Sequence, residues 1–300
     1  MLQKPRSMTN ALFCSRKVTD ARQGKGEERE HFIKRLTHLR LQDMRITTIE
    51  NLSTTRKLQA LYLNSNIITT LSGLQHSCLK NLLQLDLQDN NITSMEGLSC
   101  LSSLRRLSLA RNSIPWVIGL EYCPLLEQLD ISGQHLPDGS NGVEFDEDSI
   151  DAMSQQLVSL NASHCGLLHV EHLACLDSLT TLDISHNCIP TVSGVTTLLE
   201  QRSRRTGRNR QLKNLLMSNN PAMENGGPRV RDTLVMMAES LRCLNGVDIE
   251  PRQVSFFLSP YLFFFILFAG TEGISHNALS PALPDTLVPP FSSSVLFFSF

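Results

Sequence analysis

Two histidines and an aspartate form the most enzyme-like pattern in this sequence. His164 and His186 each follow a serine and lie 22 residues apart, and Asp183 stands three residues before the second of them. Imidazole and carboxylate groups together can bind a metal ion or transfer a proton. No Ser-His-Asp order, nucleophile elbow, zinc-protease motif or phosphate-binding glycine loop accompanies them. We therefore expect two solvated side chains and a protein that is not an enzyme, with no catalytic residue, metal or cofactor.

The eight cysteines are the other potentially reactive groups. They form no CxxC pair and no Cys/His spacing of the zinc type. No apolar signal sequence opens the chain, so we expect reduced thiols in a cytoplasmic or nuclear protein. The 27 basic and 29 acidic side chains give a net charge of −2, which excludes a global basic field for nucleic acid.

The elements that position these residues are internal repeats. Each LxL of the pattern LxxLxL is expected to be a short strand, with its two apolar residues inside and the residue between them outside. Stacked copies predict an α/β fold, a leucine-rich-repeat solenoid of 22-residue repeats with a curved parallel sheet on its concave face and a C-terminal capping helix. The eight copies begin at Leu36, Leu58, Leu82, Leu104, Leu126, Leu157, Leu179 and Leu212.

An asparagine follows the strand in five of the repeats. Its side-chain amide can satisfy backbone groups at the turn where the strand ladder ends. Met44, Gln134 and Cys165 replace it elsewhere, in the atypical first repeat and on either side of an insertion. The five asparagines are Asn66, Asn90, Asn112, Asn187 and Asn220.

The repeats divide the chain into four parts. A helix is predicted at 228–241, where apolar residues recur at helical spacing. Residues 253–300 carry only two charges and ten of the thirteen phenylalanines, so we do not expect the tail to belong to the fold. The expected parts are a flexible segment at 1–30, eight repeats at 31–225 with insertions at 138–154 and 200–211, a cap at 226–250 and an apolar tail at 251–300.

The two insertions carry opposite charge. The first is acidic, and Asp148 and Ser149 predict the N-cap of a short helix that begins at Ile150. The second contains five arginines between Arg202 and Arg210. Such a segment could bind an acidic partner such as a tubulin tail, although a solvated loop is the simpler interpretation.

The outward strand residues predict a protein-binding surface. Small polar side chains dominate these positions, and three repeats have an acid at the strand centre. An enclosed catalytic pocket is difficult to build on so open a sheet, whereas a docked protein fits it. The candidate binding residues are Arg40, Tyr62, Asn64, Asp86, Gln88, Arg106, Asp130, Asn161, His164, Asp183 and His186.

The repeat region resembles the leucine-rich-repeat regulators of protein phosphatase 1. The 22-residue repeats, the NxI turns and the segment that begins Leu241-Arg-Cys-Leu carry this resemblance. Gln134-His-Leu-Pro, the insertion at Phe145-Asp and the stretch from Leu157 to Asn187 are similar to the family of its regulatory subunit 42, and the resemblance covers roughly residues 31–252. The resemblance implies a regulatory or scaffolding protein without enzymatic activity that binds the phosphatase catalytic subunit. It also implies a cytoplasmic location at the cytoskeleton, centrosome or ciliary base.

The start of the tail offers a docking motif and an alternative function. Arg252, Val254 and Phe256 fit the basic-x-Val-x-Phe pattern that resembles the docking motif of protein phosphatase 1 partners, which bind by strand addition. Residues 254–270 carry no charge, but they contain two serines and a proline and are short for a membrane span. The alternative to a free interaction module is therefore a tail-anchored membrane adaptor that keeps the repeats cytoplasmic.

Overall fold

The computed structural model describes most of the repeat region. All described residues fall in the compact unit Met1–Leu258. The tail at 251–300, with the docking motif and the apolar stretch 254–270, lies outside them. The described residues are 8–15, 18–19, 21–75, 79–137, 139–205, 212–225, 230–237 and 240–249.

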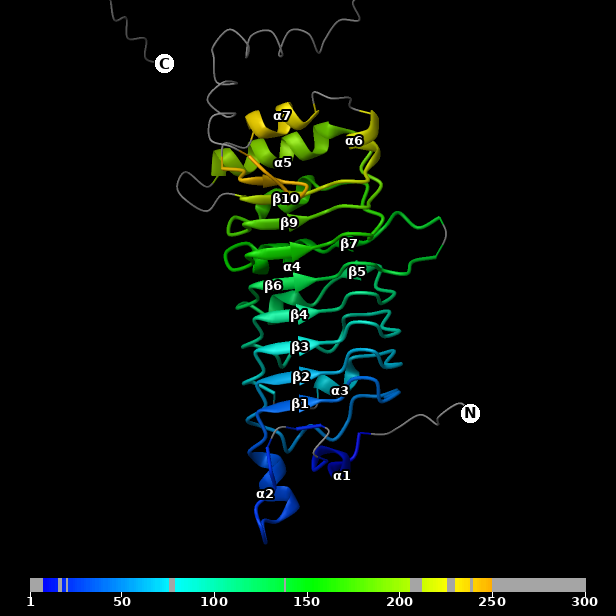
Figure 1. The fold of residues 1–300 in the computed structure, drawn as a ribbon, viewed down its shortest axis with the longest axis vertical. Helices are drawn as coiled ribbons and strands as arrows, with labels where there is room; N and C mark the ends of the chain where they lie inside the picture. The colour runs from blue at the N-terminus through cyan, green and yellow to red at the C-terminus, as the bar shows by residue number, and fades with distance from the viewer. Residues whose placement is uncertain are drawn as a thin grey trace, which may run out of the picture. The chain divides into compact units, whose positions relative to one another are not determined.

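Ten strands form one sheet, and the first nine of them pair in parallel (Figure 1). Equivalent leucines face one another across neighbouring strands, as Leu39 faces Leu61 and Leu61 faces Leu85. This register confirms that each repeat contributes one strand. The repeat strands are β1 (His38–Arg40), β2 (Ala60–Tyr62), β3 (Gln84–Asp86), β4 (Arg106–Ser108), β6 (Gln128–Asp130), β8 (Ser159–Asn161), β9 (Thr181–Asp183) and β10 (Asn214–Leu216).

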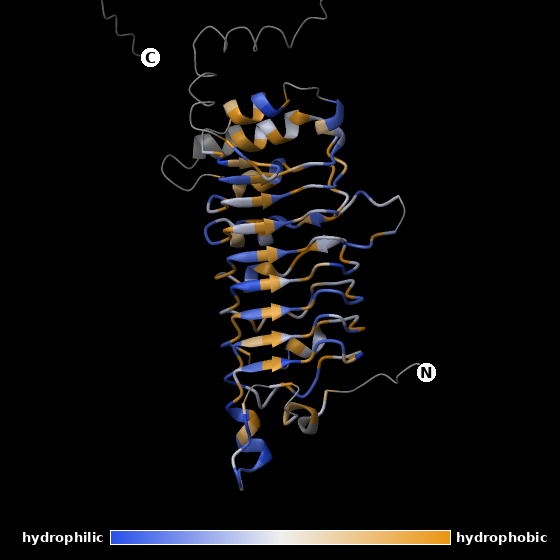
Figure 2. Ribbon diagram, viewed as in Figure 1, coloured by the Kyte–Doolittle hydropathy of each residue, from blue (hydrophilic) through white to orange (hydrophobic). Residues whose placement is uncertain are grey.

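The core is a stack of apolar residues from successive repeats. The middle residue of every repeat strand is a buried leucine, and the apolar residue that follows the strand, such as Leu41, is buried as well. Hydrophobic and hydrophilic residues alternate along the strands (Figure 2). Burial of one leucine side chain stabilises the fold by about 1.5–3 kcal/mol, so the repeat pattern itself builds the core.

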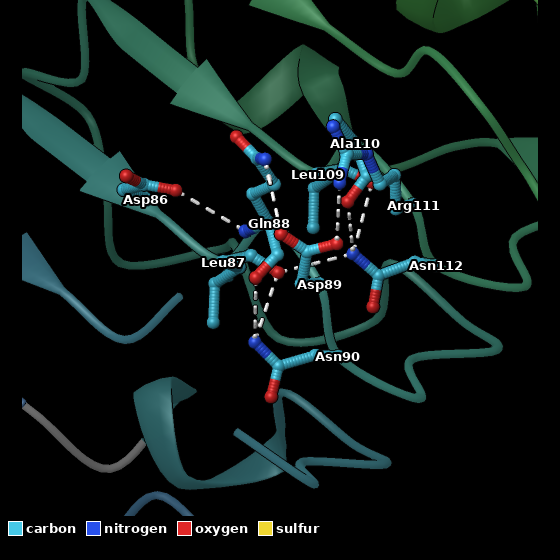
Figure 3. A network of polar contacts seen from close by, with 9 residues as sticks. All are labelled: Asp86, Leu87, Gln88, Asp89, Asn90, Leu109, Ala110, Arg111 and Asn112. Carbon is cyan, nitrogen blue, oxygen red and sulfur yellow. Dashed lines mark hydrogen bonds and ion pairs between the residues drawn. The ribbon is translucent and has the colours of Figure 1, made fainter. Parts of the chain in front are cut away.

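Buried asparagines tie each repeat to the one before it. The side-chain amide of Asn112 donates to the carbonyl oxygens of Leu109 and, in the preceding repeat, Leu87 (Figure 3). Its carbonyl oxygen accepts the backbone N–H of Ile92 at 3.0 Å. Asn90 repeats this arrangement one turn earlier. The predicted role of the asparagines is confirmed, because each satisfies backbone groups that the strand ladder no longer reaches.

Each repeat strand leads into a residue in the left-handed conformation, immediately before the asparagine position. This residue is glycine in one repeat only, Gly133. Because the same strained backbone recurs, the side chains at this position form a row along the edge of the sheet. The non-glycine members, with φ between 52° and 57°, are Asp43, Ser65, Asp89, Arg111, His164, His186 and Asn219.

Short helical turns connect the strands on the opposite side of the sheet (Figure 1). Most have seven residues or fewer, as the 22-residue repeat allows. They bury apolar residues such as Leu74, Leu120 and Leu173 against the core. The turns are α3 (Ser72–Gln75), η1 (Leu120–Tyr122), α4 (Glu147–Met153), η2 (Glu171–Cys175) and the longer α5 (Val192–Arg205).

The second insertion begins as a helix, and this corrects the expected loop at 200–211. Helix α5 continues to Arg205, and residues 206–211 lie outside the described part of the chain. Val195, Leu198 and Leu199 recur at helical spacing and are buried, so the helix packs against η2 and against α7 (Val230–Met237). The arginines at 202–205 therefore belong to helix α5, whose buried apolar residues hold it against the core.

The first insertion forms a second, two-stranded sheet. Strand β7 (Glu144–Phe145) pairs in parallel with β5 (Trp116–Val117), beyond the carboxyl ends of β4 and β6 (Figure 1). The predicted helix is present, but the position of its cap was wrong. Asp146 is the N-cap and accepts the backbone N–H of Ser149, because β7 delivers the chain to the helix two residues earlier than expected.

Cys165 lies at the asparagine position of the repeat that follows the first insertion. In neighbouring repeats the side-chain oxygen at this position accepts an N–H of the preceding repeat, as Gln134 does from Ile114 at 2.9 Å. A thiol is a much weaker acceptor, and the Cys165 thiol instead donates to the carbonyl oxygen of Ile131. The chain returns where the N–H of Val143 donates to the carbonyl oxygen of Cys165 at 2.9 Å.

The N-terminal segment is folded where it is described, which corrects the expected flexible segment at 1–30. Met8, Phe13 and Val18 are fully buried against the first repeat. The carbonyl oxygen of Val18 accepts the backbone N–H of Arg40, so the segment covers the open edge of β1. An uncovered repeat would expose its core, and this packing removes that exposure. The segment contains α1 (Asn10–Phe13) and leads into α2 (Arg29–Lys34).

The C-terminal cap closes the other end of the sheet. Helix α7 (Val230–Met237) confirms the predicted capping helix and buries Val230, Leu234 and Val235. A hairpin of β11 (Cys243–Leu244) and β12 (Val247–Asp248) follows, and β12 is the antiparallel last strand. The short helix α6 (Pro221–Asn225) precedes the cap.

Candidate protein-binding face

The strands position the predicted binding residues on one side of the sheet, which we call the concave face. Each three-residue strand buries its middle residue, so the residues on either side of it point outward. Arg106, His164 and His186 are exposed, and the other eight predicted residues are half-buried by their neighbours. The structure therefore places all the predicted concave residues where the repeat pattern put them.

A row of three polar side chains crosses β6, β8 and β9 at their carboxyl ends. Asp130, Asn161 and Asp183 occupy equivalent positions in these neighbouring strands. In each, one side-chain oxygen accepts both the N–H and the hydroxyl of a serine two residues later, with hydroxyl distances of 2.6–2.9 Å. Among the described residues, the second carboxylate oxygens of Asp130 and Asp183 have no hydrogen-bond partner. The serines fix the row and leave these oxygens available to a partner.

Asp86 lies on the same face two strands from Asp130. Burial raises the pKa of its carboxyl, the N–H of Gln88 opposes this at 3.1 Å, and the negative charges of Asp130 and Asp89 raise it further. The carboxylates of the concave face thus repel one another in the free protein. A cationic partner would relieve that repulsion.

The two histidines stack instead of forming a reactive site. Their ring centroids lie 4.0 Å apart with an interplanar angle of 11°. A nitrogen of the His186 ring contacts the side-chain amide of Asn219 at 2.9 Å, and Asp183 is held by its serine. The ring nitrogens lie in two nearly parallel planes and do not point at one atom. Across the described ranges, no group of three or more His, Cys, Asp or Glu side chains could hold a metal ion.

The buried cysteines are unreactive thiols. Burial, more than the nearby Glu121 carboxylate, raises the pKa of Cys123 to about 12. Burial also raises the pKa of Cys165 to about 12. A thiol with so high a pKa is protonated at neutral pH and is a poor nucleophile. These two cysteines therefore serve as core residues.

The structure also contains a cleft that the sequence did not indicate, beside the first insertion. We call it the insertion cleft, and its volume is about 580 Å³. The ring of His172 packs beside Phe145 with centroids 5.3 Å apart, and its Nε2 atom is buried without a hydrogen-bond partner. Burial lowers the pKa of His172, which favours the neutral ring. The lining residues are Asn141, Val143, Glu144, Phe145, Glu147, Ile150, Leu168, His169 and His172.

Two other predicted features are not tested by the described residues. The docking motif Arg252, Val254 and Phe256 and the apolar stretch 254–270 lie outside them. Within the described ranges, no helix is long and apolar enough to cross a membrane.

Comparison with known proteins agrees with the repeats. A family model described as leucine rich repeat matches residues 56–114, and one described as leucine-rich repeats in two copies matches residues 34–76. No curated protein matches the chain. A solved leucine-rich-repeat protein of Leptospira interrogans is 19% identical, with a TM-score of 0.46. The alignment covers 67% of this chain and 53% of that protein, so this chain spans about half the length of that relative. The matched models, the repeat register and the long parallel sheet together show that the chain is a leucine-rich-repeat protein.

Proposed function

We propose that this chain is a non-enzymatic protein-interaction module whose concave face binds a partner through cationic side chains. The observation that carries the proposal is the row of Asp130, Asn161 and Asp183, each fixed by a serine on one side and open on the other. Because the serines hold these groups in advance, a partner loses less conformational freedom when it pairs with them. Neighbouring strands lie about 4.8 Å apart, which matches the reach of side chains on an extended or helical partner surface.

The specific partner in this proposal is the catalytic subunit of protein phosphatase 1. Its support is the resemblance of the repeats and of Arg252, Val254 and Phe256 to regulators of that enzyme. A regulatory or scaffolding role in the cytoplasm, at the cytoskeleton or centrosome, follows from the same resemblance. Tubulin is the other candidate partner, through the arginines at 202–210.

The test is binding of the purified full chain to immobilised phosphatase catalytic subunit. The double variant Asp130→Asn/Asp183→Asn should bind about tenfold or more weakly with an unchanged melting temperature, because the exposed oxygens are lost but the serine-bound oxygens remain. Ser102→Glu, on the opposite side of the repeats, is the control and should bind normally. Weaker binding of the control alone would place the interface on the other face. No binding by the wild-type chain would refute the phosphatase as partner.

The docking motif is tested separately with a peptide of residues 248–260. Val254 and Phe256 would fill two apolar pockets while the peptide backbone pairs with a sheet edge. Calorimetry should detect binding of the wild-type peptide to the catalytic subunit and none of the Val254→Ala/Phe256→Ala peptide. Equal heats from both peptides would remove the motif from the proposal.

A further inference from the structure

The insertion cleft combines an apolar floor with an acidic rim. Val143, Phe145, Ile150 and Leu168 supply the apolar side chains, and Leu168 remains 36% exposed. Glu144 and Glu147 stand among the lining residues. A concave surface lined mainly by apolar side chains, with a few polar groups at its rim, is the usual form of a binding site in proteins.

The acids around the cleft lack cations. The segment carries five carboxylates within eight residues, and none forms an ion pair with any described lysine or arginine. Only Asp146 has a structural task, as the N-cap of α4. Five like charges close together repel one another, and a cation from outside would relieve this repulsion. These acids are Glu144, Asp146, Glu147, Asp148 and Asp151.

Strand β7 presents an unpaired edge. The N–H group of Glu144 donates to the carbonyl oxygen of Pro115, just before β5, at 2.9 Å, and that of Asp146 donates to Val117 of β5 at 3.1 Å. Alternate residues of a strand direct their backbone groups to opposite sides, so the peptide groups of Phe145 face away from β5, toward the sixth repeat. No backbone hydrogen bond joins β7 to Leu168 or His169 in the described structure. An incoming extended segment would find backbone partners there.

The chain's single tryptophan completes the surface. Trp116 lies opposite Glu144 in the β5–β7 pair, and half of its surface is exposed. An aromatic face beside carboxylates favours a guanidinium or ammonium group, which the ring and the acids both attract. The stem of an arginine or lysine can cover apolar surface while its head meets the acids.

We propose that the insertion cleft binds an extended segment of a partner protein in which arginine or lysine alternates with large apolar residues. The apolar side chains enter the cleft beside Phe145 and Leu168. The cations pair with Glu144 and Glu147, and one stacks on Trp116. This site lies beyond the carboxyl ends of the strands and uses none of the residues of the concave face.

The experiment selects peptides from a randomised nonapeptide phage library on the immobilised full-length chain. The selected sequences should be enriched in arginine or lysine next to leucine, phenylalanine or tryptophan. Synthetic copies of them, with phenylalanine in place of any tryptophan, are then titrated into the chain, so that the fluorescence of Trp116 alone reports occupancy. Two cleft variants, Glu144→Gln/Glu147→Gln and Leu168→Ser, should each bind the peptides about tenfold more weakly. The exposed Glu50→Gln and the concave Asp130→Asn are controls that should bind as wild type does.

Three outcomes would overturn the proposal. They are a lack of enrichment over the bare support, a selection of acidic or uncharged polar peptides, and peptide affinities that the cleft variants leave unchanged. Melting temperatures check that each variant is folded. We expect them to stay close to that of the wild type, because Leu168, Glu144 and Glu147 all retain solvent exposure. Loss of affinity in Asp130→Asn alone would place the peptide site on the concave face. The proposal for the cleft and the proposal for the concave face are therefore tested independently.

Discussion

Gly142 packs against the backbone of Gly166 so closely that a Cβ atom on Gly142 would lie 2.2 Å from the carbonyl oxygen of Gly166. Gly142 also has φ of +87°, a conformation that other residues adopt only with strain. At this contact the first insertion rejoins the stack of repeats, one residue before Val143 bonds to Cys165. The path of the insertion, and hence the insertion cleft, depends on these two glycines.

Gly142→Ala should destabilise the fold by about 2–4 kcal/mol, because it adds a backbone clash to the strain of positive φ. Urea unfolding measures the change. Gly139→Ala is a matched control, since Gly139 has φ of +81° but nothing within 4 Å of its added Cβ. An equal loss in both variants would show that strain alone, and not the contact with Gly166, limits this position.

Asn112→Ala should lower the free energy of unfolding by about 2–4 kcal/mol. The substitution leaves the N–H of Ile92 and the carbonyl oxygens of Leu87 and Leu109 buried without partners. Chemical denaturation of Asn91→Ala supplies the comparison, because this neighbouring asparagine is exposed and should change stability by less than about 0.5 kcal/mol. If the two variants unfold alike, the asparagines do not tie the repeats together.

Arg35→Gln should raise the pKa of Glu27. Hydrogen bonds from Arg35 chiefly, and from the N–H of Gly24, lower the pKa of the Glu27 carboxyl from 4.5 to about 2. A lowered folded-state pKa contributes stability above pH 4.5, and this contribution is lost as the pH falls through about 2. An NMR titration of the Glu27 carboxyl measures the pKa. Lys34→Gln, which breaks the pair of Lys34 with Glu30, should leave it unchanged.

Asp86→Asn should raise the melting temperature at pH 7. Burial raises the pKa of Asp86, so its charged form opposes folding at neutral pH. The sign follows from the raised pKa, because stability from this group increases as the pH falls toward the folded-state value. An asparagine can keep the backbone bond to residue 88, as Asn161 keeps its bond to Ser163. Differential scanning calorimetry at pH 7 and pH 4 should show a gain that shrinks at the lower pH. A lower melting temperature at pH 7 would mean that the carboxylate stabilises the sheet.

The repeats could be predicted from the sequence because one physical rule recurs in every copy. A buried leucine such as Leu129 must sit between outward residues, so the strand positions, the face of Asp130 and the adjacency of His164 and His186 all follow from spacing. Gln134 also replaces asparagine without changing the bonding pattern, since its longer side chain still carries the same amide.

The parts that escaped prediction depend on single contacts. Met8, Phe13 and Val18 are buried but follow no helical or strand period, so nothing in their order indicates that they cover an edge. Beside the insertion cleft, the thiol of Cys165 and the contact between Gly142 and Gly166 have no periodic signature. Helix α5 runs beyond residue 200, where the second insertion was expected to begin. Its buried residues Val195, Leu198 and Leu199 lie just before the charged segment and fix the helix on the core.

The two end strands of the sheet have a consequence for assembly. In a parallel sheet made of near-identical repeats, each uncovered edge strand has unpaired backbone groups. Another strand, from the same chain or from another molecule, can pair with them. At one edge of the sheet, the carbonyl oxygen of Val18 accepts the N–H of Arg40. At the other edge lies the two-residue antiparallel strand β12. A covered first strand and a two-residue antiparallel last strand are poor templates for another strand, so we expect molecules of this protein not to join edge to edge.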